Sequence, residues 1–133
     1  MSRFRRRILA NMIHNTKVLV SIDDYSVNAT TSIISVFDPP TLQSGKSYNI
    51  TFDYSISNVT QDGTGVQIIF SGSTTNYITL VYYKGNVGAT ISKSVSKDFT
   101  AIGSGAGSTL KIRPLGDSTG ILVSLKNIVL KEV

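Results

Sequence analysis

The residues of this sequence best suited to bind another molecule are gathered in its first 17 positions. Five of the 13 basic residues lie there, and no acid precedes Asp23. They are Arg3, Arg5, Arg6, Arg7 and Lys17. From residue 18 onward eight bases meet eight acids, so 8 − 8 = 0 and the formal charge of +5 belongs to this arm. Such an arm predicts an anionic partner, because guanidinium groups bind carboxylates and phosphates bidentately.

The same arm carries large apolar side chains at helical spacing. Phe4, Ile8 and Met12 recur every four residues, with Leu9 and Ile13 beside them. Each would contribute about 1.5–3 kcal/mol on burial, before the cost of ordering the arm. A helix this short is marginal alone, so we expect it to order only against a partner or its own domain. The predicted partner-docking residues are Arg3, Phe4, Arg5, Arg6, Arg7, Ile8, Leu9, Met12 and Ile13.

Residue types that support catalysis are scarce. His14 is the only histidine and lies in the arm, so a nucleophile elsewhere would lack its usual base. Asp23 and Asp24 are neighbours, and in a strand they would point to opposite faces and fail as an acid–base pair. The chain has no cysteine, hence no thiol nucleophile, disulfide or thiolate metal ligand. The sequence predicts no enzyme, no catalytic residue, no metal site and no cofactor.

The elements that must position any site are strands. The clearest strand covers positions 46–57, where large apolar residues alternate with polar ones. Its apolar residues are Tyr48, Ile50, Phe52, Tyr54 and Ile56. One apolar face of this size needs a second layer over it. Further short apolar runs between Gly, Pro and Asp-Gly turns bring the total to about eight strands, which predicts an all-β antiparallel sandwich over residues 18–133, preceded by the basic arm 1–17.

Two local irregularities are predicted within these strands. The alternation of one strand directs Lys93 and Lys97 inward, which indicates a bend, a bulge or an edge position. In the last strand the apolar residues change parity after Leu125, which predicts a bulge near Lys126 and Asn127.

Several stretches of the chain follow the pattern of a known family. G-K-S-Y-N-I-T-F-D-Y at Gly45–Tyr54 precedes V-Q-I-I-F, then K-D-F-T-A at Lys97–Ala101, S-T-L-K-I, and I-L-V-S-L-K-N-I-V-L-K-E at Ile121–Glu132. Over roughly residues 18–133 this order resembles the jelly-roll carbohydrate-binding modules of the family 4/9 type. The resemblance implies a jelly roll of about eight strands.

The same resemblance implies that sugars stack on exposed aromatic rings. This chain has no tryptophan, so the glycan-binding candidates are Tyr77, Tyr82 and Tyr83, of which the last two must face opposite sides of one strand. Where the family places an acid for a structural calcium, this chain has Lys126 beside Asn127.

The opening M-S-R-F-R-R-R-I-L, on a small β domain, resembles small virion proteins of tailed phages that infect gut bacteria. Jelly rolls of this size also occur as capsid, decoration and fibre domains. The first hypothesis is therefore a non-enzymatic virion structural protein, a capsid auxiliary, decoration or head-fibre component. Its arm would dock on the major capsid protein or another virion protein, and its other partners would be copies of itself.

Two alternatives remain open at this point. One is a carbohydrate-binding module or adhesin domain, located outside the cell or at its surface and recognising surface glycans. The other is a basic nucleic-acid-binding protein, whose log K would fall by about 0.9 per neutralised phosphate with rising log salt. No segment approaches the roughly 18 consecutive apolar residues of a membrane span, so none is predicted.

Overall fold

A computed structural model describes residues 17–38, 40–71, 77–101 and 109–133, which form eight β-strands. The predicted docking arm from Arg3 to Ile13, and His14, lie outside the described residues. The strands are β1 (Val18–Asn28), β2 (Ile34–Ser35), β3 (Ser47–Ser57), β4 (Thr64–Ser71), β5 (Tyr77–Gly85), β6 (Ile91–Thr100), β7 (Thr109–Leu115) and β8 (Leu122–Glu132). In these ranges no helix has the length and apolar character needed to cross a membrane.

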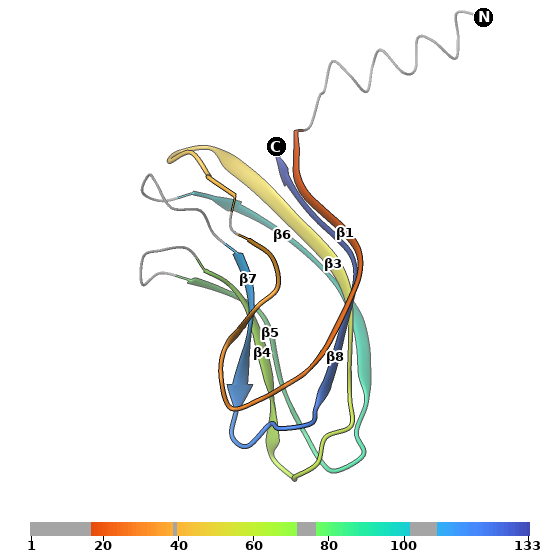
Figure 1. The fold of residues 1–133 in the computed structure, drawn as a ribbon. Helices are drawn as coiled ribbons and strands as arrows, with labels where there is room; N and C mark the ends of the chain where they lie inside the picture. The colour runs from red at the N-terminus through yellow and green to blue at the C-terminus, as the bar shows by residue number, and fades with distance from the viewer. Residues whose placement is uncertain (1–16, 39, 72–76, 102–108) are drawn as a thin grey trace, which may run out of the picture.

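The strands pair as a long hairpin that has been rolled up. β1 pairs with β8, β2 with β7, β3 with β6 and β4 with β5, all antiparallel. Contacts of β3 with β8 and of β4 with β7 complete two four-stranded sheets. The first sheet has the order β1-β8-β3-β6 and the second β2-β7-β4-β5, which face each other in Figure 1. This is the strand arrangement of a jelly roll, so the predicted fold class is confirmed.

β3 is the centre of the core, as its alternation predicts. Tyr48, Phe52 and Ile56 are almost fully buried, whereas Asp53 between them is exposed. Burying one strand face against a second sheet removes apolar surface from water at about 25 cal/mol per Å², which makes this layer the main stabilising contact. Aromatic rings also join the sheets, because Phe99 of β6 lies 4.9 Å, between ring centroids, from Phe70 of β4.

The predicted bulge in β8 is present at Asn127. Thr51 of β3 lies opposite Val129 and Asp53 opposite Lys126, so Phe52 faces two residues of β8 instead of one. Asn127 has φ 54°, a left-handed conformation that asparagine tolerates better than most residues. The extra residue lets both halves of β8 bury their apolar side chains, which are Val123, Leu125, Ile128 and Leu130.

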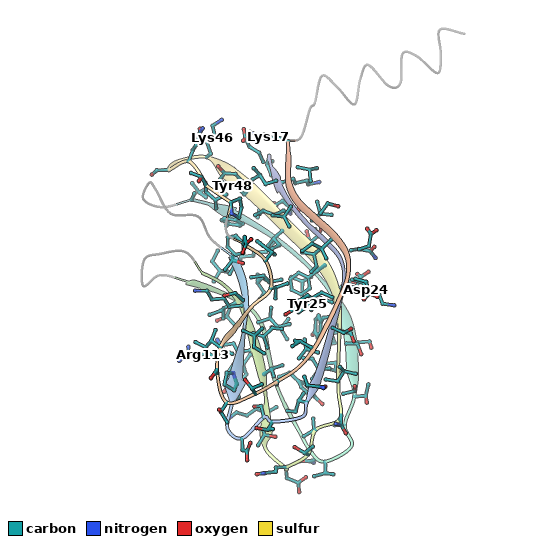
Figure 2. All side chains as sticks on the ribbon, viewed as in Figure 1. Lys17, Asp24, Tyr25, Lys46, Tyr48 and Arg113 are labelled. Atoms are coloured by element: carbon teal, nitrogen blue, oxygen red, sulfur yellow. The ribbon has the colours of Figure 1, made fainter. Side chains whose placement is uncertain are left out.

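β1 changes phase at the same height as β8. Asp23 and Asp24 are both exposed, whereas Ile22 and Tyr25 on either side of them pack against the core. Figure 2 shows Tyr25 directed into the sandwich and Asp24 directed away from it. The prediction that the two acids point to opposite faces is therefore wrong, because it assumed strict alternation and the phase change brings both to solvent.

Lys93 and Lys97 lie on an edge strand, which confirms one of the three predicted explanations for them. β6 is the last strand of the first sheet, and the two lysines lie opposite Tyr54 and Ile50 of β3. Both are exposed despite their inward parity. Inward-pointing charges on an edge strand oppose its pairing with a second molecule, which gives these lysines a structural purpose.

Candidate functional site

Three polar or aromatic residues form a straight row across the outer face of the second sheet, the face directed away from the first sheet. Gln67 of β4 lies opposite Arg113 of β7 on one side and opposite Tyr82 of β5 on the other. Residues directly opposite each other in a sheet project from the same face. Val66 and Ile68, the neighbours of Gln67, are fully buried in the core, so this row must point outward.

Tyr82 gives the row an exposed aromatic ring. Its exposed fraction is 60%, and the Lys84 ammonium stands 6.0 Å from the centre of its ring. The neighbouring Tyr83 instead packs against the core, as strand alternation requires. Tyr77 begins β5 opposite Ser71, and its side chain lies outside the described part of the chain. Of the three tyrosines predicted to bind glycans, Tyr82 is therefore the one seen to offer its ring to a ligand.

Gln67 occupies the middle of the row and is held rigidly there. Only 8% of the residue is exposed, and its amide nitrogen donates a 2.9 Å hydrogen bond to the hydroxyl of Thr79 on β5. This bond fixes the plane of an amide that can make up to four hydrogen bonds. Arg113 is exposed and lies on the outer side of β7 (Figure 2), with up to five donors in a planar fork. The row thus combines a stacking surface with directional hydrogen-bond donors.

The outer face of the first sheet carries a second candidate, an open depression of about 400 Å³. It is lined by Asp53, Tyr54, Ser55, Ser92, Lys93, Ser94, Ser124 and Lys126. It is hollow because four of its lining residues are serines, whose side chains are short. Tyr54 does not offer a ring to solvent here, because its side chain is buried between the sheets. The depression therefore lacks a stacking surface.

The carboxylate at the centre of this second candidate already has hydrogen-bond partners. The Asp53 carboxylate accepts hydrogen bonds of 2.6 Å from the Ser94 hydroxyl and 3.1 Å from the Asn127 amide. These two bonds, that of Ser94 above all, hold the pKa of Asp53 below its ordinary value. Further along the same face, the Asn49 amide donates to the carboxylate of Asp98 at 2.7 Å. A ligand that binds to Asp53 or Asp98 would have to replace these bonds, whereas the ring of Tyr82 and the guanidinium of Arg113 are exposed.

A metal site has no visible centre in the described ranges. Nowhere in them do three or more His, Cys, Asp or Glu side chains come together as a metal site would require. Lys126, where the resemblance places a calcium-binding acid, lies opposite Asp24 on one side and Asp53 on the other. An ammonium group in this place repels a cation instead of binding it.

Sequence reasoning found Tyr82 but missed its two companions. Gln67 stands at a polar position of V-Q-I-I-F, and Arg113 ends the run T-L-K-I-R. Nothing local joins them, because they are 46 residues apart in number and meet only through the register of β4 and β7. The alternation of both segments could have placed each on an outer face, but the row itself depends on strand pairing.

The chain was compared with known proteins. No protein-family model matches it, and no curated protein sequence does. Among solved structures, it is similar to a family 4 carbohydrate-binding module, with 12% identity, TM-score 0.45, and coverage of 89% of this chain and 78% of that one. It is also similar to the N-terminal cellulose-binding domain of Cellulomonas fimi β-1,4-glucanase C, with 13% identity, TM-score 0.47, and coverage of 87% and 82%.

A third similar structure is the N-terminal part of Clostridium thermocellum endo-1,4-β-D-xylanase 10B, which holds CBM22-1 and GH10 modules in complex with xylohexaose. The identity is 14% and the TM-score 0.47, over 90% of this chain and 25% of that one. The solved structures are thus of the kind that the sequence pattern resembles, carbohydrate-binding modules, and at these identities the likeness concerns the fold alone.

Proposed function

We propose that this chain is a non-catalytic carbohydrate-binding module that holds a glycan on the outer face of the second sheet. The observation that carries the proposal is the row Arg113–Gln67–Tyr82, with an exposed ring at one end and hydrogen-bond donors beside it. A pyranose has an apolar C–H face and a rim of hydroxyl groups. The ring of Tyr82 suits the first, and the amide and guanidinium groups suit the second.

The rigidity of the row supports binding in preference to catalysis. Gln67 is nearly buried and bonded to Thr79, so little conformational freedom is lost when a sugar hydroxyl binds to it. The row also suits an internal stretch of a polymer, because Tyr82, Gln67 and Arg113 lie in line across three neighbouring strands. Such a module would act where glycans are exposed, outside the cell or at a cell surface.

The virion hypothesis stays a prediction about the arm. It depends on residues 1–17, of which only Lys17 is described, and Lys17 is joined to the sandwich by a 2.8 Å hydrogen bond from the Glu132 amide to its carbonyl oxygen. No observation on the described residues supports docking to a capsid protein or to nucleic acid. The glycan-binding proposal needs only residues that the structure describes.

The test is affinity electrophoresis of the purified full chain through gels that contain soluble β-glucans, xylans, mannans, or uronate or sulfated polysaccharides. We expect retardation by at least one polymer. Tyr82→Ala should weaken that binding by about 5- to 150-fold if a sugar gains as much on the ring as a stacked base does, which is about 1–3 kcal/mol. Tyr82→Phe keeps the ring and should bind nearly normally. Val18→Ala removes an exposed apolar side chain from β1 of the first sheet and serves as the control. Absence of binding to every polymer, or normal binding by Tyr82→Ala, rejects the proposal.

A further inference from the structure

Folding separates the charges of this chain between its two sheets. The strands of the second sheet contain three bases, Lys84, Lys111 and Arg113, and no acid, so 3 − 0 = +3. The strands of the first sheet contain four bases and five acids, so 4 − 5 = −1. The four bases are Lys93, Lys97, Lys126 and Lys131. The five acids are Asp23, Asp24, Asp53, Asp98 and Glu132. The proposed glycan-binding face is therefore on the positive sheet.

The three cations of this face are not neutralised by the protein. In the parts of the chain that the structure describes, the one ion pair joins Lys46 to Glu132 and involves none of the three. All eight acids lie in those parts, because positions 1–16, 39, 72–76 and 102–108 contain no Asp or Glu. No hidden carboxylate can therefore pair with these cations.

Three acids lie in segments that flank strands of the second sheet, and two of them are already hydrogen-bonded. The third, Asp38, lies three residues after β2, is exposed and takes no part in the ion pair of the described residues. Asp62 precedes β4, and its carboxylate accepts a 2.8 Å hydrogen bond from the Val87 amide. Asp117 follows β7, and its carboxylate accepts hydrogen bonds from Gln61 at 3.1 Å and from the Thr119 amide at 3.3 Å. All three acids lie beyond the ends of strands, so they leave the middle of the face positive.

Two of the cations lie on the β7 side of the exposed ring, and the third lies over it. Arg113 lies two strands from Tyr82 in the same row, about 10 Å away at the usual strand spacing. Lys84 stands over the ring itself. Lys111 is two residues before Arg113 on β7, about 7 Å along the strand and on the same face. A glycan that stacks on Tyr82 and runs across the sheet toward β7 would therefore carry its acidic groups past Lys84, Arg113 and Lys111.

We propose, on the basis of the proposed function, that the ligand is an anionic glycan, one with carboxylate or sulfate groups along its chain. A neutral glycan would leave three cations near one another with no compensation, whereas a uronate or sulfate group would pair with Arg113 bidentately and with the lysines as point charges. Nucleic acid is also anionic, but single-strand binders stack successive bases on several rings. Among the residues whose exposure the structure describes on this face, Tyr82 alone offers an exposed aromatic ring, where a single-strand binder would use several.

The experiment compares polymers that share a backbone and differ in charge. Binding of the full chain to polygalacturonate and to its methyl ester, and to carboxymethyl cellulose and hydroxyethyl cellulose, is measured by calorimetry in about 50 mM and 500 mM NaCl. We expect at least one carboxylated polymer to bind about 10-fold more tightly than its neutral partner at low salt. This preference should shrink at high salt, where the screening length falls from about 14 Å to about 4 Å.

Variants locate the effect. Lys84→Gln and Lys111→Gln should each weaken binding of the carboxylated polymer about 3- to 5-fold, as expected for losing one exposed ion pair, and leave neutral binding unchanged. Arg113→Gln removes a group that also faces sugar hydroxyl groups, so it should weaken binding of both polymers and that of the carboxylated polymer more. Lys97→Gln and Lys131→Gln remove the same charge from the first sheet and should have no effect. The double substitution Arg5→Gln, Arg6→Gln measures the share of the arm.

The outcomes separate this inference from the proposed function. Equal binding of charged and neutral polymers, abolished by Tyr82→Ala, would overturn the anionic preference and keep the glycan-binding proposal. Failure to bind any polymer would remove both. Charge preference that is lost in the arm variant and unaffected by Arg113→Gln would also overturn the inference, and so would single-stranded DNA bound more tightly than every glycan through Tyr82 and Arg113.

Discussion

Deleting Asn127 should destabilise the domain, and deleting Asp24 from the same chain should restore most of the loss. At this bulge β8 has one residue more than β3. The alternation of β1 changes at the same place, so the neighbouring strands β1 and β8 share the irregularity. Removing Asn127 makes β8 regular against β3, with Ile128 directly opposite Phe52. It also shifts β1 by one residue, and a shift by one sends every side chain beyond it to the other face.

The cost of the single deletion follows from the residues that would be turned outward. In β1 these are Val20 and Ile22, both half-buried against the core. Full burial of such a side chain is worth about 1.5–3 kcal/mol, so half of that for each gives about 1.5–3 kcal/mol for the pair. Deleting Asp24 as well returns Ile22 to a position opposite Ile128. The double deletion also removes one left-handed residue, which offsets about 1 kcal/mol of any remaining loss.

The assay is urea unfolding followed by far-ultraviolet circular dichroism, since the chain has no tryptophan. With a slope of about 1–3 kcal/mol per M, each single deletion should lower the midpoint by roughly 1 M, and the double deletion should fall within about 0.5 M of the wild-type chain. Deletion of Asp24 alone completes the double-mutant cycle and should lower the free energy of unfolding as much as deletion of Asn127 does. If the double deletion costs the sum of the two single ones, the shared phase change is wrong.

Two further predictions concern polar groups of the sandwich. Ser118→Ala should lower the free energy of unfolding by about 1–3 kcal/mol. The fully buried hydroxyl donates to the Gly65 carbonyl and accepts from the Leu115 amide, and both groups would lose this partner. Thermal and urea unfolding measure the change, and an unchanged midpoint would contradict the prediction. Asp53→Asn should flatten the acid limb of the stability curve. The pKa of Asp53 is lowered on folding, so the contribution of its carboxylate to stability is complete above about pH 4 and is lost as pH falls through the folded pKa. Urea unfolding midpoints of both proteins between about pH 2 and pH 6 test this. Parallel curves for the two proteins would refute it.

The features that were predictable from the sequence are those set by local alternation. The apolar face of β3 can be read within eleven residues, and the parity change in β8 predicts the bulge at Asn127 because one residue must be left out of the pattern. Lys93 and Lys97 violate the parity of β6, and a charged residue pointing inward is tolerated at an edge. Each inference needs only neighbours along the chain.

What the sequence could not supply is strand pairing over long distances. β1 meets β8 across the whole length of the domain, and for that reason the joint phase change at Asp23 and Asp24 was invisible beforehand. The candidate site has the same origin. Tyr82 was recognisable as a possible stacking residue by type, but Gln67 and Arg113 join it only when β4 lies between β5 and β7 in the observed register.

Charge gives the clearest case of information that composition hides. Residues 18–133 sum to zero, and on that count the arm is the natural place to look for an electrostatic partner. The net charge says nothing about where the charges lie. In a sandwich the two outer faces are at least about 10 Å apart, the thickness of two sheets. This distance is close to the electrostatic screening length at physiological salt. A ligand on the second sheet therefore meets Lys84, Lys111 and Arg113 with little influence from the acids of the first sheet. A neutral domain can in this way present a strongly positive face, and its partner must be sought by face and not by net charge.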